Sequence, residues 1–115
     1  MKNPTELSLV LKRTHFVDIL KGIEKTEYRS FNDFYIKRLC VIGENGSVEE
    51  VKQFETVRLC MGYSKNRPEL VLECKGVFIE TDPDDESEEL SEANAEFAID
   101  LGKILEQINC EDLNV

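Results

Sequence analysis

Four charged side chains and a glycine are concentrated in the segment 22–29, Gly-Ile-Glu-Lys-Thr-Glu-Tyr-Arg. Here Lys25 and Arg29 can donate hydrogen bonds to an anion or to the edge of a nucleobase, and Glu27 can accept one from an amine. Alternatively, the lysine is an ordinary solvated one and Arg29 is structural, pairing with Glu27 across one face of a strand. The segment therefore indicates a ligand site, and the alternative interpretation is that its charged residues have a purely structural role.

The elements predicted around this segment are a strand, a helix and a second strand. Residues 7–11 alternate apolar and polar side chains with the period of a strand. Thr14 can cap a helix whose apolar residues between 16 and 23 recur at helical spacing. Residues 26–29 then read as a short extended piece. These elements place the charged segment at a helix-to-strand junction.

The remainder of the chain predicts a second short helix followed mainly by strands. The helix covers residues 31–39, and residues 43–54 have the composition of a loop. Two strand-like runs, 54–62 and 69–79, are joined by a turn and predict a hairpin. In the second run the apolar face is formed by alternate residues: Leu70, Leu72, Cys74, Gly76 and Phe78. A last strand follows over residues 97–101.

This order of elements predicts one α+β domain over residues 1–115. Parallel βαβ alternation is not sustained, so the best match is a small, mostly antiparallel β-barrel with one or two flanking helices. Five aromatic residues fit core positions better than a stacking platform: Phe16, Phe31, Phe34, Phe54 and Phe78.

The charge of the chain is unevenly placed. The 115 residues carry a net charge of −10, which argues against a general binder of duplex nucleic acid, because such proteins neutralise phosphates with cations. Residues 1–79 hold 13 Lys+Arg and 11 Asp+Glu, whereas residues 80–115 hold 1 and 13. Recognition of a single base by the near-neutral part stays open. The acidic loop at about 80–94 is either solvated or a docking site for a basic protein partner.

Several classes of protein are excluded or disfavoured. No apolar run approaches the roughly 20 residues of a membrane helix, and the N-terminal alternation is unlike a signal peptide. Cys40, Cys60, Cys74 and Cys110 lack CxxC spacing, and His15 is the single histidine. We therefore expect a cytoplasmic protein with reduced thiols, no metal site, no cofactor and no membrane partner.

Several segments, taken in chain order, resemble the ASCH domain family. The first comprises a lysine after the first strand, an aromatic-x-x-Ile helix and a Glu-Tyr-Arg return strand, and the later ones match the family's middle hairpin and closing strand. The segments are Lys12, 16–22, 27–29, 57–59, 62–63, 72–77 and 97–102. The resemblance covers nearly the whole chain apart from the acidic loop.

The resemblance implies a PUA-like β-barrel that binds RNA or a modified nucleobase. The family's cleft lies between the helix-to-strand junction and the barrel. Carried over to this chain, the ligand-binding residues are Lys12, Lys25, Glu27 and Arg29, with Tyr63 and Lys65 at the rim. Tyr63 is either a platform on which a base stacks or a plain cap of the hairpin.

Some ASCH proteins are amidohydrolases that remove the acyl group of N4-acetylcytidine with a lysine, a threonine and a distant glutamate. In this chain Glu24 occupies the lysine position and Glu27 the threonine position, so the family's catalytic pattern is not preserved. The main prediction is therefore binding of RNA or a modified nucleotide. The alternatives are a hydrolase of N4-acylated cytidines that uses Lys25 and Glu27, and a protein-interaction module that uses the acidic loop.

Overall fold

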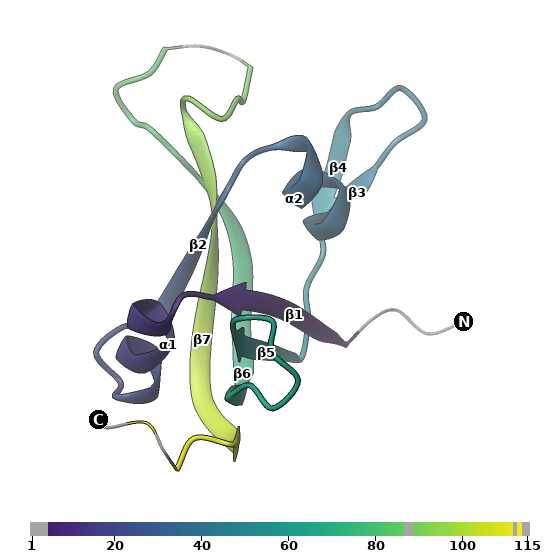
Figure 1. The fold of residues 1–115 in the computed structure, drawn as a ribbon. Helices are drawn as coiled ribbons and strands as arrows, with labels where there is room; N and C mark the ends of the chain where they lie inside the picture. The colour runs from purple at the N-terminus through teal and green to yellow at the C-terminus, as the bar shows by residue number, and fades with distance from the viewer. Residues whose placement is uncertain (1–4, 87–88, 112, 114–115) are drawn as a thin grey trace.

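Strands predominate in the computed structural model, which describes residues 5–86, 89–111 and 113 (Figure 1). In chain order the elements are β1 (Glu6–Leu11), α1 (Arg13–Leu20), β2 (Thr26–Ser30), α2 (Asp33–Leu39), β3 (Cys40–Ile42), β4 (Val48–Val51), β5 (Thr56–Met61), β6 (Glu69–Thr81) and β7 (Ala95–Ile108). Within those described residues, no helix has the length and apolar character needed to cross a membrane.

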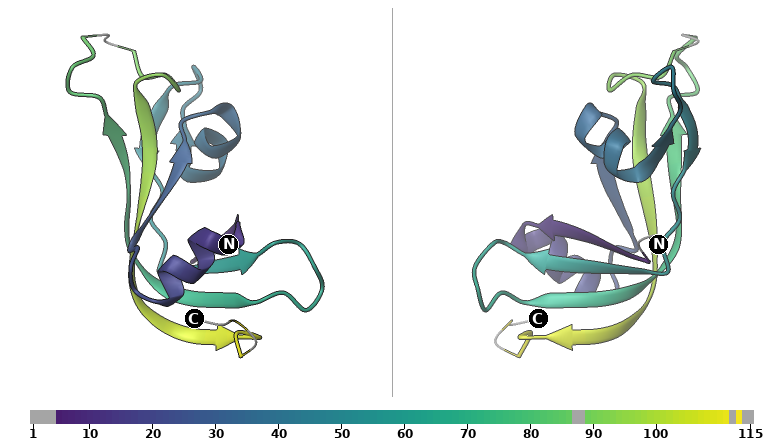
Figure 2. Two further views of the ribbon diagram at one scale, coloured as in Figure 1. Left: turned by 60° about the vertical axis from the view of Figure 1, so that its left-hand side comes forward. Right: turned by 90° about the vertical axis from the view of Figure 1, so that its right-hand side faces the viewer.

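Five of the strands form one curled sheet in the order β1-β5-β6-β7-β2, in which only the β1–β5 pair is parallel. The two long strands β6 and β7 bend together, and their pairing shifts register three times between Val71 and Gly76. Such irregularities bend a strand and increase its twist. The sheet therefore has two arms at an angle, with both helices on the concave side (Figure 2). This confirms the α+β class: the mostly antiparallel sheet forms a half-barrel flanked by two helices.

The core fills the concave side of the sheet. Helix α1 contributes Phe16 and Ile19, and the strands contribute alternate apolar side chains, Phe97 and Leu59 among them, that are fully buried. Of the five aromatic residues predicted in the core, Phe16, Phe31 and Phe54 are buried, which confirms those three.

Phe34 and Phe78 are exceptions, because their side chains are 62% and 50% exposed. Strict alternation along β6 predicts Phe78 on the core face. The register shifts before Gly76 move Val77 to the buried face instead, where it is 1% exposed. Phe34 lies on the outward side of α2, a helix in which only Leu39 is fully buried.

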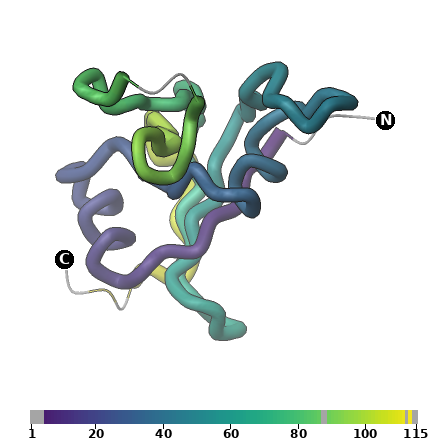
Figure 3. Tube along the Cα trace, turned by 90° about the horizontal axis from the view of Figure 1, so that it is seen from above, coloured from purple at the N-terminus to yellow at the C-terminus, as the bar shows by residue number. Residues whose placement is uncertain are grey.

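Two local predictions were also wrong. Helix α1 begins at Arg13 after Lys12, not after Thr14, and Lys12 makes no side-chain cap. Residues 43–54, predicted as a loop, contain β4, which pairs with β3. This small hairpin projects on the side opposite the described parts of the segment 82–94 (Figure 3). The four residues of β4, Val-Glu-Glu-Val, are exposed or half-buried and do not alternate between apolar and polar. The local sequence therefore does not predict a strand here.

A chain of ion pairs ties β1 to the β5–β6 hairpin. Nε of Arg58 lies 3.0 Å from Oε1 of Glu6, and its Nη1 lies 2.7 Å from Oε1 of Glu69. Arg67 binds the second oxygen of Glu69 at 3.2 Å. The hydrogen bond from Arg58 holds the pKa of Glu69 below its usual value, with Arg67 adding to the effect.

This arrangement predicts an acid-sensitive contribution to stability. A carboxylate whose pKa is lowered by folding stabilises the protein above its ordinary pKa of about 4.3 and loses that contribution as the pH falls through the folded value. We expect the Glu69→Gln variant to be less stable than the wild type at pH 7 by up to about 1 kcal/mol, as for surface pairs. The gap should close below pH 4. Urea denaturation from pH 7 to pH 3 measures this, and a gap that is constant with pH would contradict it.

Candidate functional site

The centre of the candidate site is the pair Glu27 and Arg29 on the edge strand β2. Glu27 pairs with Ile99 of β7, and alternation turns both charged side chains to the concave face while Tyr28 faces outward. Glu27 is 7% exposed. Arg29 contacts its Oε2 atom through Nη2 at 2.8 Å and through Nε at 3.2 Å. The pairing proposed from the sequence as the structural role of Arg29 is thus formed.

Arg29 has two further partners, on two other elements. Its Nη2 donates to the carbonyl oxygen of Val10 in β1 at 2.9 Å, and its Nη1 donates to the hydroxyl of Tyr35 in α2 at 2.7 Å. Strands β1 and β2 are the two edges of the sheet. The guanidinium therefore bridges the open side of the half-barrel and anchors α2 there, and it fixes the orientation of the Glu27 carboxylate.

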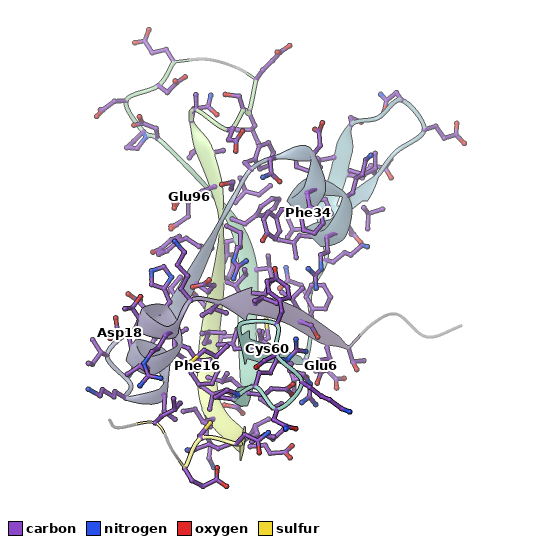
Figure 4. All side chains as sticks on the ribbon, viewed as in Figure 1. Glu6, Phe16, Asp18, Phe34, Cys60 and Glu96 are labelled. Carbon is purple, nitrogen blue, oxygen red and sulfur yellow. The ribbon has the colours of Figure 1, made fainter. Side chains whose placement is uncertain are left out.

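A hollow of about 260 Å³ lies between α1 and β2 beside this pair. Its lining comes from the exposed side of α1, from the turn after it, and from β2: His15, Asp18, Glu24, Thr26, Glu27 and Tyr28. Phe16 and Asp18 lie on opposite sides of α1, Phe16 towards the sheet (Figure 4). Burial of one side of the helix thus presents the other side to the hollow.

The turn between α1 and β2 is held by local hydrogen bonds. Oε1 of Glu24 accepts from the backbone N–H groups of Lys25 and Thr26, at 3.1 and 3.2 Å. Gly22 has a φ of +77°, in the left-handed region that favours glycine, and this lets the chain reverse directly after the helix. The position of the hollow is therefore set by backbone geometry as well as by packing.

Hydrogen-bond acceptors dominate the lining. Oε2 of Glu27 is held by Arg29, whereas Oε1 accepts no hydrogen bond from the described residues. Asp18 and Glu24 add two carboxylates, and the hydroxyl of Thr26 donates to Oδ1 of Asp100 at 3.2 Å. Such a site suits a ligand that presents N–H donors, and it repels a phosphate.

The six predicted ligand residues do not all meet at this hollow. Glu27 lines it, and Lys25 is an exposed residue between two lining residues. Lys12 is exposed at the start of α1, and Arg29 is occupied by the contacts described above. Tyr63, 84% exposed, and Lys65 lie in the β5–β6 turn, outside the lining. A hydrogen bond from Gly62 N to the carbonyl of Leu11 brings that turn beside the end of β1.

Five of the lining residues were not predicted as ligand residues from the sequence: His15, Asp18, Glu24, Thr26 and Tyr28. The available signal was the spacing of three between His15 and Asp18, which puts both on one side of a helix. That side adjoins the one that carries Phe16 and Ile19, the residues that are buried. His15 had been considered only as a metal ligand.

The described residues hold no group of three or more His, Cys, Asp or Glu side chains that could bind a metal ion. Burial raises the pKa of the thiols of Cys40, Cys60, Cys74 and Cys110. Cysteines act as nucleophiles in the thiolate form, which a raised pKa disfavours at neutral pH. The chemistry of the candidate site therefore rests on its oxygen and imidazole groups.

No protein-family model, curated protein sequence or solved structure matches this chain. The ASCH resemblance stays a prediction carried by the segments of the sequence quoted for it. The function has to be argued from the geometry of the hollow and its surroundings.

Proposed function

We propose that this protein is a PUA-like domain that binds RNA or a modified nucleoside and accommodates one base in the hollow between α1 and β2. The observation that carries the proposal is the state of Glu27. Its carboxylate is buried and lines the hollow, one oxygen is held by Arg29, and the other is left to accept a hydrogen bond. A preoriented acceptor of this kind reads an amino group on the edge of a base.

The size and charge of the hollow support a single base. Pockets for drug-sized ligands have volumes of roughly 300–1,000 Å³. The hollow, at about 260 Å³, suits something smaller. Its three carboxylates disfavour a phosphate inside, so the backbone of a nucleotide would remain outside. There the exposed side chains of Lys12 and Lys25 are available to it.

Tyr28 supplies a surface on which the base can stack. Tyr28 is one of the residues that line the hollow, on the edge strand β2, and its side chain is half-exposed. Stacking of a base on an aromatic ring contributes roughly 1–3 kcal/mol. Stacking was one of the two roles that the sequence left open for Tyr63, and here we propose it for Tyr28. The curled, mostly antiparallel sheet with two flanking helices is consistent with the PUA-like barrel, and free thiols accord with a cytoplasmic location.

Titration with a panel of nucleosides tests the proposal. We expect cytidine or another base with an exocyclic amine to bind more tightly than uridine, which presents a carbonyl in place of the amine. Glu27→Gln should lower the affinity about tenfold or more, since hydrogen bonds to charged groups contribute roughly 1.5–3 kcal/mol. Calorimetry at low salt measures both effects. Lys37→Ala, on the exposed side of α2 and outside the lining, is the control and should leave binding unchanged.

A second variant distinguishes a loss of binding from a loss of folding. Asp18→Asn changes the lining on a partly exposed side of α1 and removes none of the hydrogen-bond partners of Arg29, and circular dichroism confirms that each variant is folded. Absence of binding by every nucleoside and by single-stranded RNA would overturn the proposal. So would binding that neither Glu27→Gln nor Asp18→Asn affects.

The same panel separates binding from hydrolysis. The hydrolase alternative assigns catalysis to Lys25 and Glu27, but Lys25 is exposed and outside the lining. We therefore expect N4-acetylcytidine to be bound without release of cytidine and acetate. Release that disappears in the Lys25→Ala variant would favour the hydrolase, because Lys25 and Glu27 are the catalytic residues of that alternative.

A further inference from the structure

The convex face of the sheet carries an aromatic row that neither helix covers. Tyr28, Ala98 and Phe78 lie side by side on β2, β7 and β6, as the strand register shows. The two aromatic side chains are each 50% exposed, while Ala98 between them is 3% exposed. Both helices lie on the other side of the sheet (Figure 2). This face of the sheet is therefore accessible to a partner molecule.

Gly76 shapes one end of the row. A Cβ atom at this position would lie 2.6 Å from the ring of Phe78, so the ring lies over the glycine backbone. An aromatic ring laid along a sheet, next to a small residue, presents a broad apolar surface to a partner. The exposed half of Phe78 is the part that a partner would contact.

Carboxylates lie along one side of the aromatic row. The next row of the sheet includes Glu96 and Glu80, and Glu96 is marked on the upper part of β7 in Figure 4. A groove of about 410 Å³ opens here, and its lining includes Tyr28, Glu80, Asp82, Glu92 and Glu96. Within the described residues, none of these four carboxylates forms a salt bridge.

The groove therefore has a strongly negative potential. The pKa of Tyr28 is raised above its usual value, first by the charge of Glu80 and then by partial burial and the charges of Glu24, Glu96 and Asp100. Like charges held this close repel one another, at a cost to the stability of the fold. A cation placed among them would remove that cost.

We propose that this face, the aromatic row together with the carboxylate groove, docks a basic segment of a partner protein. A Lys or Arg side chain of the segment enters the groove and stacks on Tyr28, and the apolar part of the segment covers Phe78. Cation–π contact with a tyrosine and pairing with carboxylates reinforce each other at one site. A nucleic acid is repelled by the same charges, so the occupant is a polypeptide.

This surface is separate from the proposed base site except for Tyr28, which lines both. Phe78, Glu80 and Glu96 do not line the hollow beside Glu27. The groove shares Glu80, Asp82 and Glu92 with the acidic loop, and the inference goes beyond docking on that loop because it adds Tyr28, Phe78 and Glu96 on the strands β2, β6 and β7. Variants at these strand positions can therefore test docking without touching the base site.

The probe is a labelled nine-residue peptide of alternating arginine and leucine, titrated into the full chain at low salt. We expect binding that weakens with added salt, with NMR shift changes at residues 28, 78, 80 and 96. The double variant Glu80→Gln/Glu96→Gln should weaken binding at least tenfold, and Phe78→Ala should weaken it several-fold. Nucleoside binding should stay as in the wild type, which separates this test from that of the proposed function.

A matched control removes two charges elsewhere. Glu49→Gln/Glu50→Gln changes the exposed strand β4, on the hairpin that projects away from this face (Figure 3). We expect this double variant to bind the peptide as the wild type does. Equal weakening by both double variants would show that net charge alone attracts the peptide, and would overturn the proposal.

Two other outcomes would also overturn it. The first is no binding of the peptide at low salt. The second is binding of spermine at the same residues with equal affinity, which would assign the groove to a small polyamine. Relief of repulsion should raise the Tm of Glu80→Gln/Glu96→Gln above the wild-type value, and a lowered Tm would contradict the picture of uncompensated carboxylates.

Discussion

Replacing Arg29 with alanine is expected to destabilise this protein by about 3–5 kcal/mol, the range found when one partner of a buried ion pair is removed. Three groups lose their donor in this variant: Oε2 of Glu27, the carbonyl of Val10 and the hydroxyl of Tyr35. The Glu27 carboxylate, 7% exposed, is then left without a compensating charge. Small domains have a total stability of roughly 5–15 kcal/mol, so a large part of it would be lost.

Urea denaturation followed by circular dichroism measures this effect. Arg58→Ala is the matched control, because Arg58 also bridges strands through two carboxylates but its side chain is 30% exposed. For that variant we expect a loss of about 1 kcal/mol or less, as for surface pairs. Arg29→Lys keeps the charge but not the fork of donors, and we expect an intermediate loss. A loss below 1 kcal/mol for Arg29→Ala would show that the bridge across the half-barrel is dispensable.

This expectation also bears on how the base site is tested. Arg29 was among the predicted ligand residues, yet its guanidinium is occupied by the fold. Loss of binding in Arg29→Ala would therefore follow from unfolding whether or not the side chain touches a ligand. The variants at Glu27 and Asp18, checked for folding, carry the functional test instead.

Replacing Phe97 with alanine is expected to cost about 3–5 kcal/mol, the usual range for removing a buried phenylalanine. Phe97 is fully buried on the concave face of β7, in register with Arg29 on one side and Ile79 on the other. Its ring contacts that of Phe31 with centroids 5.3 Å apart. Phe31 leads directly into α2, so the cavity left by the truncation would loosen the attachment of that helix to the sheet.

Phe78→Ala is the control for this second variant. It removes the same group from the convex face of the adjacent strand, where the side chain is 50% exposed. We expect a loss of less than about 1.5 kcal/mol there, because less apolar surface is returned to water and no cavity forms. Thermal unfolding followed by circular dichroism compares the two. Equal losses of stability in the two variants would mean that both faces of the sheet contribute equally to stability. That result would contradict the expectation based on the burial of Phe97 and the exposure of Phe78.

Some features of the site could be predicted from the sequence because they depend on neighbours in the chain. Alternation along 26–29 puts Glu27 and Arg29 on one face, and the two side chains do pair. The helix over 31–39 and the hairpin of the two later strands were likewise found where local patterns placed them. Each of these patterns is an interaction over a few residues, or the period of one element.

Other features depend on distant residues, and no local pattern revealed them. The exposure of Phe78 follows from register shifts between β6 and β7, which are set by the pairing of two long strands. The attachment of Arg29 to Val10 joins segments 19 residues apart, across the open side of the sheet. The lining of the hollow by His15 and Asp18 requires α1 to lie beside β2, which its chain spacing alone does not dictate.

The sequence by itself determined the class of the fold, the charge asymmetry and the pairing of Glu27 with Arg29, because composition and short-range periodicity specify them. Only the tertiary structure decided that Arg29 is occupied by the fold and that one oxygen of Glu27 accepts no hydrogen bond from the described residues. It also decided that Tyr28 and Phe78 form one exposed row, since this depends on the register of three strands. The physical reason is that burial and free hydrogen-bonding capacity arise only when distant segments are packed together.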